Sequence, residues 1–244
     1  KGCQLNVINS SRGEVINNTF FEQTHVITYM EEVRKTICYN EKEKSFFFLG
    51  MDLKNIPKGG GSISAVLFKL GVDNKKIETI KLPNGPSSYL LNLNNDLIGL
   101  YNLSGQFSVI DIYGKQQEIY NVNFNKDEKI PLNKIFDEDT IARYYYSLNI
   151  GLFAWSKGGF VRKMASSDLK KENTTVDFKL NDRLLFMNDF QYNSKTVLLF
   201  GQGKVGEKSI SKLSLYDSID SKVIWEKNFE QKFCSISVSP DGKL

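Results

Sequence analysis

Hydrophobic residues alternate with polar ones at a period of two in many short runs along the chain. In residues 3–9, Leu5 and Val7 alternate with Gln4 and Asn6. Residues 105–114 place Phe107 and Val109 on one face with a glycine at each end. Such runs recur roughly every 8 to 12 residues, which is the spacing of an all-β sandwich, barrel or propeller. The pattern therefore predicts an all-β fold.

Turn-forming residues separate these runs, as at Asn84-Gly85-Pro86, Ser104-Gly105 and Asp241-Gly242. Helical periodicity is weak. We expect at most one short helix, within residues 133–141, because the tyrosines that follow at 144–146 favour a strand.

Several segments share one pattern, in which an alternating strand is followed by an Asp- or Asn-bearing turn and a second strand. The clearest copies are residues 5–20, 107–124 and 213–229, and looser copies are 66–82 and 160–178. Two further short strands precede the copies at 107–124 and 213–229. The sequence therefore predicts repeats of four strands, each roughly 40 to 60 residues long.

Four antiparallel strands per repeat form the blade of a β-propeller. Residues 233–244, FCSISVSPDGKL, resemble the opening of a WD40- or YVTN-type blade, where a Ser-Pro-Asp-Gly turn links the innermost strand to the next one. Residues 213–229 resemble the segment that normally carries a Trp-Asp pair, with Tyr216-Asp217 in its place. The Gly-His dipeptide of standard WD repeats is absent, since His25 follows Thr24. The resemblance, clearest in residues 213–244, therefore implies a divergent propeller without the usual Asp–His network.

We accordingly predict one β-propeller-like domain over residues 1–244, with about four blades and a partial blade at each end. The chain begins at what resembles a third strand and stops after the first strand of another blade. We expect an incomplete portion of a larger ring of roughly six to eight blades. A five-blade ring completed by the N-terminal strands is the alternative.

Residues 201–206, GQGKVG, carry the G-x-G-x-x-G pattern of a dinucleotide-binding turn. That chemistry requires a helix to begin at the last glycine, so that its amides face the pyrophosphate. Here a new alternating strand follows within four residues. A phosphate-binding loop also fails, because Glu207 stands where lysine is needed. We expect a glycine-rich hairpin loop and no nucleotide.

Other chemical motifs are equally incomplete. Residues 123–134 imitate a calcium loop but have Glu128 at the glycine position and Lys134 at the acidic one. One histidine and three scattered cysteines argue against a zinc site. We therefore predict no catalytic, cofactor-binding or metal residue. The acidic runs at 31–32 and 137–139 leave a glycosidase-like carboxylate pair as an open alternative.

Composition limits the possible partners. The net charge of +4 arises from 32 basic and 28 acidic residues of interspersed sign, which favours a solvated surface over a nucleic-acid footprint. No apolar run approaches the roughly 20 residues of a membrane-spanning helix. Gly2-Cys3 is compatible with a lipoprotein cleavage remnant, although Lys1 fits that interpretation poorly.

Arginine and aromatic residues, the types enriched at interface hot spots, gather in residues 142–155. We select Arg143, Tyr145 and Trp155 as partner-binding candidates; packing between blades is the alternative. The fold-level expectation is a non-catalytic scaffold that recognises a protein or peptide and has no cofactor. The rival hypotheses are a carboxylate-based hydrolase or lyase and a cell-envelope lipoprotein that binds glycan or peptide. The sequence does not indicate a compartment.

Overall fold

The computed structural model describes residues 2–22, 24–26, 37–52, 65–72, 77–82, 89–94, 96–102, 105–122, 142–170, 177–204, 209–233 and 236. Every regular element among these residues is a β-strand, so the predicted all-β class is confirmed. The chain divides into two compact units. Unit 1 comprises Lys1–Asn102 and Gln106–Tyr120, and unit 2 comprises Leu103–Gly105 and Asn121–Leu244. A single domain over 1–244 stays a prediction, and the expected helix at 133–141 lies outside the described residues.

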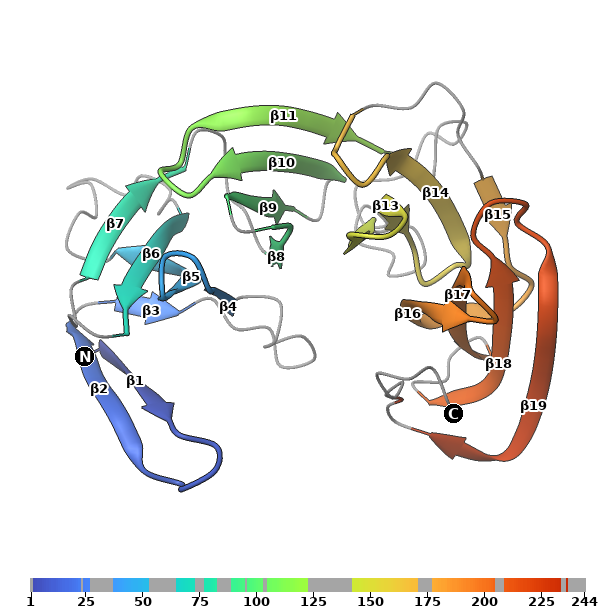
Figure 1. Cartoon of the computed structure of the whole chain (residues 1–244), viewed down its shortest axis with the longest axis horizontal. Helices are drawn as coiled ribbons and strands as arrows, with labels where there is room; N and C mark the ends of the chain where they lie inside the picture. The colour runs from blue at the N-terminus through green and yellow to red at the C-terminus, as the bar shows by residue number, and fades with distance from the viewer. Residues whose placement is uncertain are drawn as a thin grey trace, which may run out of the picture. The chain divides into compact units, whose positions relative to one another are not determined.

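The described residues of unit 1 form three antiparallel sheets (Figure 1). The first is the hairpin of β1 (Gly2–Ile8) and β2 (Val15–Glu22). The second orders β5 (Ser45–Asp52), β6 (Ala65–Gly71) and β7 (Ile77–Lys81), and one edge of β5 pairs with two short strands, β3 (Thr24–Val26) and β4 (Ile37–Asn40). The third is the meander of β8 (Tyr89–Asn92), β9 (Leu97–Tyr101), β10 (Gln106–Asp111) and β11 (Gln116–Asn121).

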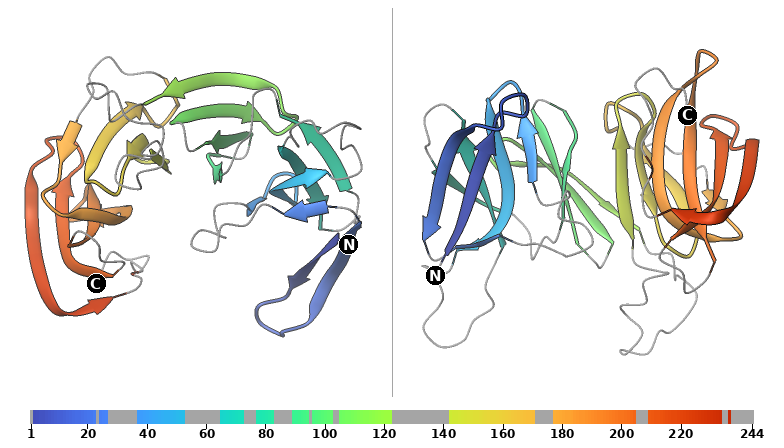
Figure 2. Two further views of the ribbon diagram at one scale, coloured as in Figure 1. Left: turned by 180° about the vertical axis from the view of Figure 1, so that it is seen from behind. Right: turned by 90° about the horizontal axis from the view of Figure 1, so that it is seen from below.

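In unit 2, the residues that the structure describes form two four-stranded antiparallel meanders. The first orders β12 (Arg143–Ser147), β13 (Gly151–Trp155), β14 (Phe160–Ala165) and β15 (Asp177–Lys179). The second orders β16 (Arg183–Tyr192), β17 (Lys195–Gly203), β18 (Ile210–Asp217) and β19 (Val223–Phe233). The long and mostly exposed β19 forms the edge of its sheet (Figure 2). These four-stranded meanders are the predicted propeller blades.

The repeats found in the sequence correspond to one kind of hairpin. Each copy covers the last two strands of a sheet, namely β1–β2, β6–β7, β10–β11, β14–β15 and β18–β19. The two strands predicted to precede the copies at 107–124 and 213–229 are β8–β9 and β16–β17. The repeat unit of four strands is therefore confirmed.

Apolar side chains on both faces of the middle strands build the core. In β17, Val197, Leu198, Leu199 and Phe200 are consecutive and fully buried, which requires cover on both faces of the sheet. Leu198 and Phe200 pack in one cluster with residues of the preceding sheet, such as Phe153. Val197 and Leu199 pack in another cluster with residues of their own sheet. A comparable cluster in unit 1 joins β5 and β6 to β8, β9 and β10.

A chain of polar side chains crosses the last sheet of unit 2, in a fold where the standard Asp–His network was not expected. The Gln202 Nε2 donates to the buried Ser214 Oγ at 2.6 Å, and this hydroxyl donates to Glu226 Oε1 at 3.0 Å. Lys212 Nζ lies 3.0 Å from the same carboxylate oxygen. Burial lowers the pKa of Lys212, but the bonds and charges of Glu226 and Asp182 outweigh it and the pKa is raised. The network links β17, β18 and β19 across the sheet.

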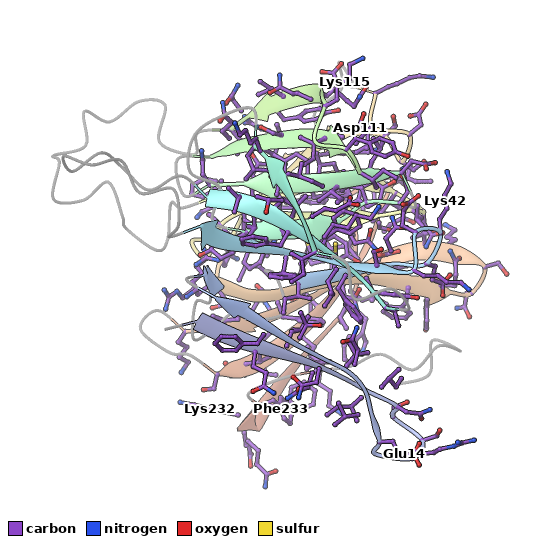
Figure 3. The ribbon with its side chains drawn as sticks, turned by 90° about the vertical axis from the view of Figure 1, so that its left-hand side faces the viewer. Glu14, Lys42, Asp111, Lys115, Lys232 and Phe233 are labelled. Atoms are coloured by element: carbon purple, nitrogen blue, oxygen red, sulfur yellow. The ribbon has the colours of Figure 1, made fainter. Side chains whose placement is uncertain are left out.

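In the β1–β2, β10–β11 and β18–β19 hairpins, the turn is capped by the side chain of its first residue. Asp217 Oδ1 accepts from the amides of Ile219 (2.9 Å) and Asp220 (3.2 Å). Asp111 Oδ1 accepts from the amides of Tyr113 and Lys115, both at 2.9 Å (Figure 3). The Asn9 side chain makes the corresponding bonds in the β1–β2 turn. These three Asp- or Asn-bearing turns of the sequence repeat are therefore Asx turns.

The GQGKVG segment is partly strand. Gly201 and Gly203 lie inside β17, and β18 begins at Ile210, so a strand stands where a nucleotide-binding helix would be required. The expectation that these two glycines belong to the hairpin loop is wrong, since both are strand residues of β17. A Cβ at Gly201 would lie 2.9 Å from Ile210 Cδ1, and one at Gly203 would lie 2.4 Å from the Ser209 carbonyl oxygen. These glycines allow close packing within the sheet.

We predict that Ser221→Gly stabilises unit 2. Ser221 has a φ of +57°, which costs an L-residue free energy that glycine does not incur. Its Oγ is one of the buried side-chain oxygens that lack a hydrogen-bond partner among the described residues. The gain should exceed the entropy that glycine adds to the unfolded chain, and the free energy of unfolding should rise by about 1 kcal/mol. Urea denaturation measures it.

Gly114→Ala is the matched control in the β10–β11 turn. Gly114 also has a positive φ, of +88°, but an added Cβ would lie 2.3 Å from Ile80 Cγ2. This substitution should lower the free energy of unfolding by about 2 kcal/mol or more. A loss of stability in the Ser221 variant would contradict the strain argument.

Candidate functional site

A pocket of about 630 Å³ opens at the turn ends of the two sheets of unit 2. Four turns contribute to it, those between β12 and β13, β14 and β15, β16 and β17, and β18 and β19. In an antiparallel meander, the turns after the first and third strands lie at the same end of the sheet. Two adjacent meanders therefore bring four turns together, and we call this site the turn pocket.

The lining of the turn pocket is mainly polar. Its uncharged polar groups are those of Asn149, Ser166, Ser167, Ser194, Thr196 and Ser218. Its positively charged groups are Lys163 and Lys195, and its negatively charged groups are Asp217 and Asp220. Ile150 and Ile219 supply aliphatic surface. The volume lies within the range of roughly 300 to 1,000 Å³ that is usual for ligand sites.

Hydrogen bonds between the turns hold the wall formed by the last sheet. The Ser218 hydroxyl donates to the Thr196 carbonyl at 2.7 Å, which ties the β18–β19 turn to the start of β17. Gln191 Nε2 donates to the Thr196 hydroxyl at 2.7 Å. Asn193 and Ser194 both have positive φ, so the β16–β17 turn is tight. The polar groups on this wall are therefore held in place before any ligand binds.

The charged groups in the turn pocket differ in how many hydrogen-bond and ion-pair partners they already have within the protein. The amides of Ile219 and Asp220 hold the pKa of Asp217 below its ordinary value, with a smaller contribution from Lys195. The side chain of Asp217 is 13% exposed, whereas that of Lys195 is 71% exposed. Their charged atoms lie 3.5 Å apart, which is long for a charge-assisted hydrogen bond. Asp217 is thus committed to its turn, while the ammonium of Lys195 is open to solvent.

Tyr145 joins the two sheets beside the turn pocket. Its hydroxyl donates to the Asp189 carboxylate, lies 2.8 Å from Asn188 Oδ1, and accepts from the Asp189 amide at 3.0 Å. Asn149, which lines the pocket, donates to the other oxygen of Asp189 at 3.1 Å. Burial raises the pKa of Tyr145, as do the hydrogen bond and the charge of Asp189. This cluster fixes the β12–β13 turn against β16.

The other two predicted binding residues are brought together away from the turn pocket. Arg143 and Trp155 are register partners at the far ends of β12 and β13 from their turn. Both are buried, and the Arg143 guanidinium lies 5.5 Å from the centre of the Trp155 ring. Tyr145 is the candidate that lies beside the pocket. The binding role of all three stays a prediction.

The sequence pattern does not reveal the residues of the turn pocket. Asp217 is recognisable as part of a repeated turn, but nothing local indicates that four turns meet. Lys163 and Lys195 are single lysines in a chain with 32 basic residues, and they carry no motif. The usable signal is the repeat phase, since residues at equivalent turns of adjacent blades share one end of the fold.

Several candidates from the sequence fall outside the part of the chain that the structure describes. They are the calcium-like segment at 123–134 and the acidic runs at 31–32 and 137–139. Within the described ranges, no three His, Cys, Asp or Glu side chains are placed to hold a metal ion. The same ranges contain no helix long and apolar enough to cross a membrane.

Comparisons with known proteins identify the fold. No family model matches the chain, and a search of curated proteins finds no match. Among solved structures, the chain is similar to BBS1N in complex with ARL6DN (TM-score 0.54, 9% identity, 95% of this chain and 63% of that one). It is also similar to Kuenenia stuttgartiensis hydrazine synthase (TM-score 0.57, 12% identity, 92% and 57%). A third match is the Dos1 propeller (TM-score 0.52, 13% identity, 86% and 54%).

These similarities show the fold alone, because the identities are low. The chain is a divergent β-propeller, as its resemblance to WD40- and YVTN-type blades implied. It spans between 54% and 63% of the length of these three structures. The matches include both a protein complex and a structure named as a synthase, so the fold does not by itself identify a function.

We predict that Tyr145→Phe destabilises unit 2 by about 1 to 3 kcal/mol, because Asp189 loses a half-buried hydrogen-bond donor. Tyr146→Phe is the matched control in the same strand. Its hydroxyl donates to the Ser167 carbonyl at 2.6 Å at a more exposed position, so its loss should cost under about 1 kcal/mol. Urea denaturation followed by fluorescence measures both. Equal costs would show that the Tyr145–Asp189 contact is not special.

The carboxyl group of Asp168, in the β14–β15 turn, should titrate near pH 2. Its pKa is lowered from 3.8 to about 2, first by the hydrogen bond from Ser166 and then by Lys170. Because the folded pKa is depressed, the associated stability is present above pH 4 and is lost as the pH falls toward 2. Carbon-detected NMR measures the midpoint. Ser166→Ala should raise it, and an unchanged midpoint would refute the assigned cause.

Proposed function

We propose that this propeller is a non-catalytic interaction scaffold and that the turn ends of unit 2 present its binding surface to a protein partner. The observation that carries the proposal is the turn pocket, which gathers polar groups from four turns on a preformed wall. Solved propellers with this fold include one captured in complex with another protein, ARL6DN. Rigid sheets that display turns at one end are suited to recognition.

Exposed aliphatic residues beside the pocket support a protein partner. Ile219 is 82% exposed and Leu148 is 68% exposed, and both occupy turns that line or adjoin the pocket. Aliphatic side chains presented next to polar groups are common at protein interfaces. A protein or peptide partner, in preference to nucleic acid, stays a prediction that this surface favours.

The rival hydrolase hypothesis predicts carboxyl groups with raised pKa at the mouth of a site. Among the described residues, the carboxyl groups whose pKa is clearly shifted are Asp168 and Asp217, and both pKa values are lowered. Both carboxylates accept hydrogen bonds from their own turns. This favours a scaffold over acid–base chemistry at the turn pocket.

Site-specific photo-crosslinking in cells tests the proposal. A photoreactive phenylalanine analogue at Ile219 or at Leu148 should capture one and the same discrete partner protein, identified by mass spectrometry. Both sites flank the turn pocket, so a single bound partner should reach both.

The control places the analogue at Glu230, which is also exposed but lies near the end of the edge strand β19 that is far from the β18–β19 turn. We expect little or no capture of that partner there. An identical set of captured proteins at all three positions, or none at Ile219 and Leu148, would overturn the proposed surface.

A further inference from the structure

We propose that the turn pocket binds a single acidic side chain within an extended peptide segment of the partner, with Lys163 and Lys195 as the recognising cations. This inference rests on the proposed function and names the chemistry of the partner. It follows from the arrangement of charges in the pocket, from the aliphatic rim, and from the chemical groups that the lining lacks.

The two lysines come from different sheets and therefore act from different walls. Lys163 belongs to β14 and is half-buried, whereas Lys195 begins β17 and is exposed. An ammonium group has three donors, and the 3.5 Å contact of Lys195 with Asp217 leaves donors for a ligand. A carboxylate placed in the pocket can receive hydrogen bonds from both walls at once.

The two acids limit how much negative charge the pocket accepts. The charge of Asp217 is stabilised by hydrogen bonds from the amides of its own turn, and Lys195 lies 3.5 Å away. Asp220 is exposed at the rim, where its charge repels a second anion. One acidic residue flanked by uncharged residues therefore fits better than an acidic run. The same repulsion disfavours polyanions such as nucleic acids.

The remaining lining suits a peptide. The hydroxyls of Ser167 and Ser194, together with the Asn149 amide, offer donors and acceptors for main-chain groups. Ile150 and the exposed Ile219 provide surface for aliphatic neighbours of the acidic residue. No aromatic side chain is among the described residues that line the pocket, so it lacks the stacking platform that sugars and nucleobases usually use.

Display selection tests this inference even while the identity of the partner is open. A library of random linear ten-residue peptides is selected on the full chain, and the enriched sequences are measured by fluorescence anisotropy. We expect a shared Asp or Glu with aliphatic neighbours. Replacing that residue in the peptide by Asn or Gln should weaken binding at least about tenfold, since one charged hydrogen bond is lost.

Variants of the chain locate the binding site. Lys163→Met with Lys195→Met should weaken binding of the selected peptides at least about tenfold. Lys195→Met alone, at a side chain that is 71% exposed, preserves the test if the double variant does not fold. Lys115→Met, at an exposed lysine of the β10–β11 turn in unit 1 and outside the pocket lining, is the control and should leave binding unchanged.

Three results would overturn the inference: no enriched peptide, enriched peptides without an acidic residue, or binding that the Lys163 and Lys195 substitutions do not weaken. Competition by heparin or single-stranded DNA at low ionic strength that equals competition by the selected peptide would instead show a general anion site. These failures are separable from failure of the scaffold, because a partner crosslinked at Ile219 and at Leu148 would remain.

Discussion

Within each unit, neighbouring sheets are held together by the apolar faces that they turn toward each other. A four-stranded antiparallel sheet has little stability alone, and it becomes a domain only when its faces are covered. β17 shows the consequence most clearly, since Leu198 and Phe200 pack toward one side and Val197 and Leu199 toward the other. Such a strand leaves no position for polar chemistry in its middle. The polar groups that can meet a ligand are therefore displaced to the turns.

This constraint explains why the fold could be predicted from the sequence and the site could not. Alternation, turn residues and repeat phase are local, and they identified the four-stranded unit and the paired outer strands. The structural role of Gly201 and Gly203, in contrast, depends on contacts with residues outside the motif. A side chain at Gly201 would collide with Ile210, and one at Gly203 would collide with Ser209, both of which come later in the chain. A glycine pattern alone does not distinguish such close packing from a loop.

The binding candidates divide for the same reason. Arg143, Tyr145 and Trp155 were chosen because their types are common at interfaces, and the structure buries two of them in mutual contact. The type of a residue indicates which interactions its side chain can make, but it does not indicate which face of a strand the side chain occupies. Lys195 and Ser194 are ordinary surface residues by type. They become interesting only because two sheets bring their turns into one pocket.

The Asx caps fix the shape of a turn without using the side chain that the turn exposes. The cap of Asp217 uses one side-chain oxygen and two main-chain amides, and the cap of Asp111 does the same. The side chains at the third turn position, Tyr113 and Ile219, take no part in either bond and are among the most exposed apolar groups of the described residues. Substitution there alters what the surface displays without altering the hairpin beneath it. Related chains can therefore diverge in recognition while they keep one scaffold.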